Sequence, residues 1–183
     1  MDTFSRSQVS VLADALKIQH GLNALTRADS LNHLSNLICG FSEDDLSKIP
    51  KHDFKKIKSK VFANLNACSN SQLRVLHDKV VNAYGEPQTW SASLLKHIGI
   101  VLISLTKNEI QSLRPLTLRG VNIDLIRQHK PDLLHAFTSE QLKVLIMPEP
   151  PFQTVNSRPR ASELQEICFL MGLFLRAYLL LKF

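Results

Sequence analysis

The stretch Phe137–Leu145, FTSEQLKVL, decides how this chain folds, because its chemistry recurs along the sequence. A Thr or Ser precedes an amide or acid by three positions. One apolar residue stands before the hydroxyl residue, and another follows the amide or acid. In such a capping box the hydroxyl accepts a bond from a free N–H of the first helical turn, and the amide or acid reaches back to the N–H of the cap residue. Each copy therefore predicts the start of a helix.

The pattern occurs four times, as FSEDDLSKI, CSNSQLRVL, LTKNEIQSL and FTSEQLKVL. The four predicted caps are Ser42, Ser69, Thr106 and Thr138. Their spacings of 27, 37 and 32 residues are typical of helical repeat arrays, but they are too irregular for a strict tetratricopeptide or ankyrin repeat. The sequence predicts an all-α fold. Its form is a degenerate helical-repeat superhelix, an armadillo-like solenoid of short capped helices that bury their apolar stripes against one another.

The segments between the caps also have helical periodicity. Apolar residues recur every three or four positions in Lys51–Asn66 and in Ser69–Tyr84, and the second of these ends at Gly85. Ser91–Ser104 is apolar on nearly all sides and predicts a deeply buried helix. The alternative of a strand over IGIVLISL lacks a second strand to pair with. Residues 121–129 and 131–136 predict two shorter helices, the second beginning at its proline.

The composition changes after Met147, where a 14-residue stretch holds four of the eight prolines. We expect a repeat domain over residues 1–146, a Pro-rich linker over 147–163 and a hydrophobic tail over 164–183. The run from Ile167 to Phe183 falls short of the roughly 20 apolar residues that a spanning helix needs. Arg176 near its centre disfavours insertion. A loosely docked or undocked helix is therefore expected, with membrane association through the tail as the alternative.

The three cysteines, Cys39, Cys68 and Cys168, form no CxxC pair and no zinc-like spacing with histidine. An odd and sparse set favours buried free thiols. The alternative is a single Cys39–Cys68 bridge, if the protein is secreted.

The net charge of +6 is a moderate basic bias, concentrated in KIPKHDFKKIKSK. The basic residues of this stretch are Lys48, Lys51, Lys55, Lys56, Lys58 and Lys60. Periodicity favours the solvated face of a helix that buries Phe54, Ile57 and Val61. The alternative is an anion-binding patch. No Arg is interleaved for base stacking, so a nucleic-acid partner is not expected.

Catalytic patterns are not evident in the chain. His129, Asp132 and His135 are spaced by three, but Pro131 interrupts a helix through both histidines, so no metal site is predicted there. GxSxG, HExxH, P-loop and GxGxxG sequences do not occur. The expected protein is not an enzyme and has no cofactor.

The repeated capping phrase resembles the mesothelin, stereocilin and otoancorin family, and its otoancorin-like members most. The resemblance rests on TSEQLKVL following PDLLHAF, and on CGFSEDDLSKIP earlier in the chain, and it extends over about Leu12–Leu145. It implies a superhelix similar to armadillo repeats and a non-enzymatic role at the cell surface. It also implies adhesion of cells to extracellular matrices, as in the attachment of acellular gels to the apical surface of epithelia. The implied partners are matrix or gel proteins.

The chain departs from the family pattern, because no signal peptide opens it and no N-x-Ser/Thr sequon occurs. Ser157 or Ser162 gives only a weak lipid-anchor signal. The resemblance therefore predicts a cell-surface or extracellular location, whereas the chain expressed as given predicts a cytoplasmic one. A truncated copy without function is one reading of these departures. The other alternative is a cytosolic helical-repeat adaptor that binds an acidic protein partner through the lysine face.

Overall fold

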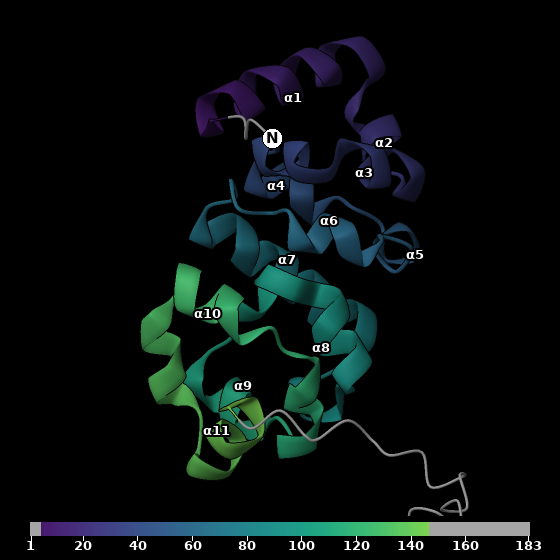
Figure 1. Cartoon of the computed structure of the whole chain (residues 1–183). Coiled ribbons are helices and arrows are strands. Elements are labelled where there is room, and N and C mark those ends of the chain that lie inside the picture. The colour runs from purple at the N-terminus through teal and green to yellow at the C-terminus, as the bar shows by residue number, and fades with distance from the viewer. Residues whose placement is uncertain (1–4, 147–183) are drawn as a thin grey trace, which may run out of the picture. The chain divides into compact units, whose positions relative to one another are not determined.

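The computed structural model describes residues 5–146 of the chain. Within this range every regular element is an α-helix or a 3-10 helix, and none is a strand (Figure 1). The all-α prediction is therefore confirmed. The predicted linker over 147–163 and the tail over 164–183, with Cys168 and Arg176, lie outside the described residues.

The described residues form two consecutive repeats and the beginning of a third. The first repeat, residues 5–68, contains α1 (Arg6–His20), α2 (Leu22–Leu25), α3 (Ala28–Leu34), η1 (Ser35–Gly40), α4 (Glu43–Ser47), α5 (Lys51–Phe54) and α6 (Ser59–Ala63). The second repeat, residues 69–137, contains α7 (Asn70–Tyr84), η2 (Pro87–Thr89), α8 (Ala92–Ile98), η3 (Gly99–Ser104), α9 (Lys107–Ser112), η4 (Pro115–Gly120), α10 (Ile123–His129) and η5 (Pro131–Ala136). The final element described is α11 (Ser139–Ile146).

The two repeats correspond element by element at an offset of 64 residues. Helices α1 and α7 are both 15 residues long, and they begin at residues 6 and 70. The pairs α3 and α8, η1 and η3, and α6 and α10 begin at the same offset. The sequences agree where the structures do, since SRSQVSVLAD (5–14) matches SNSQLRVLHD (69–78). TSEQLKVL (138–145) opens a third copy after the second repeat gains η5.

The long helix of each repeat ends in the same way. Gly21 follows α1 with φ 75° and Gly85 follows α7 with φ 87°. Both glycine N–H groups bond back to a carbonyl of the last turn, that of Lys17 or Val81. A left-handed residue at this position is a common helix stop, and glycine adopts it without steric cost. The predicted end of the helix over Ser69–Tyr84 is thus confirmed.

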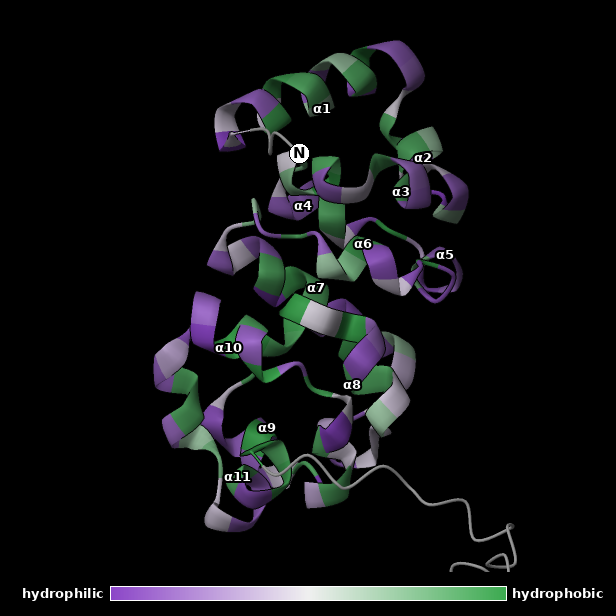
Figure 2. Ribbon diagram, viewed as in Figure 1, coloured by the Kyte–Doolittle hydropathy of each residue, from purple (hydrophilic) through white to green (hydrophobic). Residues whose placement is uncertain are grey.

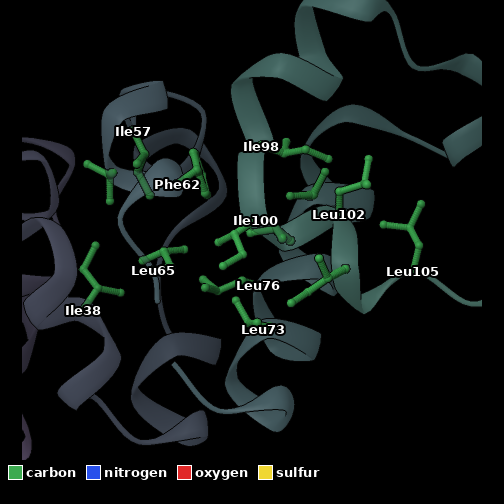
Figure 3. Close-up of a cluster of buried hydrophobic side chains, with 14 of the residues drawn as sticks. Ile38, Ile57, Phe62, Leu65, Leu73, Leu76, Ile98, Ile100, Leu102 and Leu105 are labelled. Atoms are coloured by element: carbon green, nitrogen blue, oxygen red, sulfur yellow. The ribbon is translucent and has the colours of Figure 1, made fainter. Parts of the chain in front are cut away.

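One apolar core continues across the boundary between the repeats. Figure 3 shows Ile57, Phe62 and Leu65 of the first repeat near Leu73 and Leu76 of α7 and Ile100 of η3. Helix α7 contacts α4 and α5 of the first repeat and η3 of its own repeat. It therefore belongs to the packing of both repeats. Apolar and polar residues alternate around it, as they do around α1 (Figure 2).

The predicted single helix over Lys51–Asn66 is wrong, because the chain breaks into α5 and α6. Lys58 adopts an extended conformation between the two helices. Asn32, from α3, satisfies the interrupted backbone. Its Oδ1 accepts from the N–H of Lys58 at 2.7 Å, and its Nδ2 donates to the carbonyl of Lys56 at 3.1 Å. A distant amide thus replaces the helical hydrogen bonds, which periodicity within the segment does not reveal.

The predicted helix over Ser91–Ser104 is also divided, into α8 and the 3-10 helix η3. The division lies at Gly99, where φ is 50°. No strand forms over IGIVLISL. The two shorter helices predicted after Val121 are confirmed as α10 and η5, with Pro131 in the first turn of η5.

Candidate functional site

All four predicted helix caps are formed in the structure. Ser42, Ser69 and Thr106 each accept a hydrogen bond from the N–H of the third helical residue, whose side chain accepts from the N–H of the cap. Thr138 makes the same pair of bonds with Gln141, at 3.3 and 2.9 Å. A fifth capping box at Ser5, with Gln8 as the third residue, was missed by sequence reasoning. The signal was present in the sequence, since FSRSQVSVL has Phe4 before Ser5 and Gln8 three positions after it.

In the four later boxes the third residue also reaches the preceding part of the fold, and its chemistry alternates. At the start of the second repeat, Gln72 uses its Oε1 for the cap and its Nε2 for the first repeat. The Nε2 donates to the carbonyls of Cys39 and Phe41 at 2.9 and 2.6 Å. Gln141 donates in the same way to the carbonyls of Ile110 and Leu113 at 2.7 and 2.8 Å. Both amide side chains are buried at a repeat boundary. Each accepts a hydrogen bond from the N–H of its cap residue and donates to two carbonyls of the preceding repeat.

Within each repeat the corresponding third residue is an acid that lies close to a nitrogen-bearing side chain, a lysine or a histidine, of the repeat's long helix. Asp45 Oδ2 lies 3.0 Å from Lys17 Nζ on α1. Glu109 Oε1, 64 positions later, lies 3.1 Å from His77 Nε2 on α7. The residue of α1 that corresponds to His77 is Ala13, and Lys17 lies one helical turn after it. The acids therefore join elements within a repeat, whereas the amides join successive repeats.

The electrostatics of these acids follow from their hydrogen bonds. Burial opposes ionisation of Asp45, but bonds from Lys17 and from Ser42 outweigh it and lower its pKa below the usual 3.8. Burial likewise opposes ionisation of Glu109, and bonds from Thr106 together with His77 lower its pKa below 4.5. Bonds to Asp14 and Asp45 raise the pKa of Lys17 above 10.5. Both acids are thus ionised near neutral pH and serve as fixed charges.

Cys39 and Cys68 form a disulfide, with an S–S distance of 2.08 Å and a Cα–Cα distance of 4.5 Å. The sequence analysis favoured free thiols for this pair, and the structure instead has the bridged alternative. The bond joins η1 to the last residue of the first repeat, directly before the cap Ser69. Gln72 bonds the carbonyl of the same Cys39, so covalent and hydrogen-bonded links converge on one turn.

The second repeat has no such bridge at the corresponding positions. Ile103 corresponds to Cys39, and Phe137, which precedes its own cap, corresponds to Cys68. Both are buried apolar residues. Apolar side chains therefore pack in the second repeat at the positions where a disulfide joins the chain in the first repeat. The disulfide is therefore a specific property of residues 39–68 and is not required by the repeat architecture.

The six lysines of the basic cluster are all exposed, along the edge formed by α4, α5 and α6. Lys48 pairs with Asp44 at 2.6 Å, and Lys55 Nζ lies 5.9 Å from the centre of the Tyr84 ring. Phe54, Ile57 and Val61 are buried beneath the cluster, as the periodicity predicted, although Phe54 lies in α5, Val61 in α6 and Ile57 between the two helices. The corresponding positions of the second repeat are Ser112, Pro115, Arg119, Gly120, Asn122 and Asp124. Five of the six lysines therefore have no basic counterpart.

The buried polar side chains have structural partners. Asp53 Oδ1 accepts from the N–H of Ala28 at 3.0 Å, and its Oδ2 lies 2.7 Å from His52 Nε2. Thr26 and Thr117 donate to carbonyls three residues back, at 3.2 and 2.7 Å. With Gln72, Gln141 and His77, these residues complete the set of buried polar side chains in 5–146. Each one supports a turn, a helix end or a contact between elements. His77 Nε2 lies 3.1 Å from Glu109 Oε1 but, among the described residues, makes no hydrogen bond of good geometry.

His97 is a different case, since it lies half-buried between repeats. Its ring centroid is 5.3 Å from that of Phe62 on α6 and 6.4 Å from that of Tyr84 on α7. Among the described residues its Nε2 has no hydrogen-bond partner. Burial lowers the pKa of His97 below 6.5, against a smaller opposing effect of a hydrogen bond with the Ile57 backbone. The folded state therefore favours the neutral imidazole of His97.

His129 ends α10, and Asp132 and His135 lie in η5 beyond it. In the part of the chain that the structure describes, no group of three or more His, Cys, Asp or Glu side chains is placed to hold a metal ion. Nor does any helix between residues 5 and 146 have the length and apolar character needed to cross a membrane. Comparisons of the chain with models of known protein families, with curated proteins and with solved structures found no match.

Proposed function

We propose that the chain is a non-enzymatic, extracellular scaffold whose helical repeats form a superhelix and bind other proteins over a broad surface in cell–matrix adhesion. The observation that carries the proposal is the Cys39–Cys68 disulfide, which lies at a repeat boundary within an all-α array. Disulfides persist in oxidising environments such as the cell exterior and are rare in the cytosol. A bridge at this boundary therefore favours the extracellular alternative.

The use of the buried polar groups supports a scaffold. Gln72 and Gln141 join successive repeats, and Asp45 and Glu109 join elements within each repeat. These side chains are committed to holding backbone and helices in place. In repeat proteins each unit contacts mainly its neighbours, which leaves extended surfaces for partners. Adhesion through such a surface is also what the family resemblance implies, with matrix or gel proteins as the partners.

The experiment follows the native protein in cells that make it. Unpermeabilised cells are labelled with an antibody to the chain. Thiols are alkylated at lysis, and the Cys39–Cys68 peptide is mapped by mass spectrometry without reduction. Beads carrying the purified chain are then placed on acellular matrix under flow, beside beads carrying the Cys39→Ala/Cys68→Ala variant. We expect surface labelling, a mapped bridge and better retention of the native beads. A wholly cytosolic protein with both thiols alkylated contradicts the proposal.

A second candidate function has its own observation in its favour. The lysine cluster is exposed and is absent from the second repeat, so the repeat fold does not require it. A cytosolic adaptor would use this face to bind an acidic partner. Replacing Lys55, Lys56 and Lys58 by Glu should then abolish binding to an acidic model peptide in low salt. The matched control replaces Lys96, Lys107 and Lys143, which lie outside the cluster. Equal binding by both variants excludes this role.

A further inference from the structure

The outward surface of α1 and α3 differs from its counterpart in the second repeat in one consistent way. Leu12 on α1 is 38 % exposed, whereas Leu76, its counterpart on α7, is 2 % exposed. Gln8 is exposed, whereas Gln72 is buried. The same holds for Leu16 and Leu34, which are partly buried where Val80 and Ile98 are completely buried. The first repeat thus carries the same apolar face without the cover that the second repeat receives.

The structure identifies what supplies that cover in the second repeat. We call the surface that α7 and α8 meet the trailing surface of the first repeat. It consists of the carbonyls of Cys39 and Phe41 and of helices α4, α5 and α6. From it, Phe62 of α6 packs against His97 on α8, with ring centroids 5.3 Å apart. Gln72 bonds the two carbonyls at the other end of the contact.

In the first repeat the matching place is an open groove. It encloses about 390 Å³ and is lined in part by Leu16, His20 and Leu25 together with His33 and Leu34 of α3. His33 corresponds to His97, and it is exposed here because no residue of 5–146 takes the position of Phe62. Val11, beside Leu12 on the same helix, is 68 % exposed. An apolar groove, two exposed aliphatic side chains and an exposed amide donor lie where a repeat contact is made elsewhere in the chain.

We propose that the outward face of α1 and α3 is a docking surface for the trailing surface of another helical repeat of this type. The partner's short helix would place an apolar residue equivalent to Phe62 in the groove over His33. Its two converging carbonyls would accept hydrogen bonds from Gln8 Nε2. This partner goes beyond the adhesion proposed above, because it concerns assembly of the repeats and is independent of any matrix ligand.

A second copy of this chain does not meet these requirements. The trailing surface of its first repeat is covered by its own α7, and that of its second repeat is contacted by α11, whose Gln141 bonds Ile110 and Leu113. The occupant is therefore a repeat whose trailing surface is free. Ser35 sets one limit on the fit. At the corresponding position a Cβ on Gly99 would lie 3.1 Å from the carbonyl oxygen of Phe62, so the docked helix lies a few tenths of an ångström further out.

The test adds such a repeat to the full chain. Residues 5–68 are inserted once more directly before Ser5, which reproduces the native junction between Cys68 and Ser69. The inserted copy carries Ile18→Val, because Ile18 is 88 % exposed and the change marks the mass of its peptides. Hydrogen exchange is measured by mass spectrometry in peptides of the original α1. Burial of a side chain such as Leu12 changes the equilibrium constant for local opening of the helix by a factor of about ten or more. Hydrogen exchange in the original α1 should therefore slow by about tenfold.

Two variants and one folding control keep the result specific. Gln8→Ala in the original α1 should reverse the slowing in the tandem protein and lower the melting temperature of the unextended chain only slightly, because there Gln8 loses only its exposed bond to the N–H of Ser5. Phe62→Asp in the inserted copy alone should restore fast exchange in the original α1. Exchange in the helices of the inserted copy reports whether that copy is folded. If the copy is folded and the original α1 exchanges as fast as in the unextended chain, the proposal is overturned.

Two other occupants are distinguished by the unextended chain. A dimer in solution that Leu12→Glu dissociates would show that a second copy covers α1. Faster exchange in α1 after deletion of residues 148–183 would show that the chain's own C-terminal segment covers it. Either result overturns the proposal. Surface labelling and bead adhesion are not involved, so failure of the adhesion proposal leaves this test intact.

Discussion

Ser35 and Gly99 adopt the same left-handed backbone conformation 64 residues apart, with φ/ψ of 50°/−119° and 50°/−122°. Each residue ends an α-helix and begins the 3-10 helix that follows it. The neighbouring side chains differ between the two repeats, so this turn is a property of the repeated backbone. Glycine adopts it readily, whereas a residue with a Cβ is strained there.

Exchanging the two residue types should change stability in opposite directions. Ser35→Gly removes strain of about 1–3 kcal/mol and adds roughly 0.5–1 kcal/mol of chain entropy cost, so we expect a small net stabilisation. Gly99→Ser adds strain and brings a Cβ within 3.1 Å of the Phe62 carbonyl oxygen, so it should destabilise by more than about 1 kcal/mol. Urea unfolding of both variants measures the difference. A loss of stability in Ser35→Gly would contradict the assignment of strain.

The amide of Gln72 should contribute more to stability than the amide of Gln8, although both complete a capping box. Gln72→Ala leaves the buried carbonyls of Cys39 and Phe41 without their donor, which costs about 1–3 kcal/mol. Gln8→Ala removes an exposed bond to the N–H of Ser5 and should cost less than about 0.5 kcal/mol in the chain as it stands. Denaturant midpoints of the two variants provide the matched comparison, and equal shifts would show that Gln72 acts only as a cap.

His97 should make the fold sensitive to mild acid. Because burial lowers its pKa, the unfolded chain takes up a proton near pH 6.5 that the folded chain does not yet bind. The free energy of unfolding therefore falls as the pH drops through about 6.5 towards the lower folded pKa, and this loss is absent above that range. His97→Phe should flatten the pH dependence in this window. Thermal unfolding between about pH 7.5 and 5.5 tests this, and an unchanged slope in the variant would exclude His97 as the cause.

The disulfide should stabilise the first repeat by reducing the conformational entropy of the unfolded chain. Closing a loop of 29 residues corresponds to about 3–4 kcal/mol in the chain-entropy model. Cys39→Ala/Cys68→Ala should lower the free energy of unfolding by about this amount. Hydrogen exchange should increase first in η1 and α6, and α9 to α11 should change least. Uniform destabilisation of both repeats would instead show that the chain unfolds as one cooperative unit.

Loss of the cap at Thr106 should have a pH-dependent effect. Thr106→Ala should cost about 1 kcal/mol near pH 7, because the N–H of Glu109 loses its acceptor. The hydroxyl of Thr106 also donates to the Glu109 carboxylate at 2.8 Å and helps to lower its pKa. Stability from that lowered pKa is present above 4.5 and disappears as the pH falls through the folded value. The cost of the substitution should therefore decrease at about pH 3, as acid-range unfolding curves would record.

The sequence was sufficient for the features that depend on neighbouring residues. The boxes at Ser42, Ser69, Thr106 and Thr138 are local, since cap and third residue lie in one turn. The break between α5 and α6 could not be predicted from its own segment, because its hydrogen-bond partner, Asn32, lies 24 to 26 residues away. The bridge between Cys39 and Cys68 was left open for the same reason. Their proximity depends on how η1 packs at the end of the first repeat.

The sequence analysis also missed the 64-residue duplication, but for a different reason. SRSQVSVL and SNSQLRVL share enough residues for the match to be found by comparing the chain with itself. The spacings between successive caps hid it, because each repeat contains two capping boxes of unequal spacing. The distinction between the boxes lies in the third residue, an amide at the start of a repeat and an acid within it. Only the contacts of Gln72 and Glu109 explain why both types occur.

The alternation of amide and acid limits how a chain of this kind can change length. Gain or loss of a whole repeat keeps an amide facing the carbonyls of the preceding repeat. Removal of half a repeat would instead direct a carboxylate such as that of Glu109 at those carbonyl oxygens, where oxygen faces oxygen and no proton is shared. Lengthening in whole repeats is therefore tolerated by the polar groups, and lengthening in halves is not. The polar residues at the helix starts set the size of the step by which the array can grow.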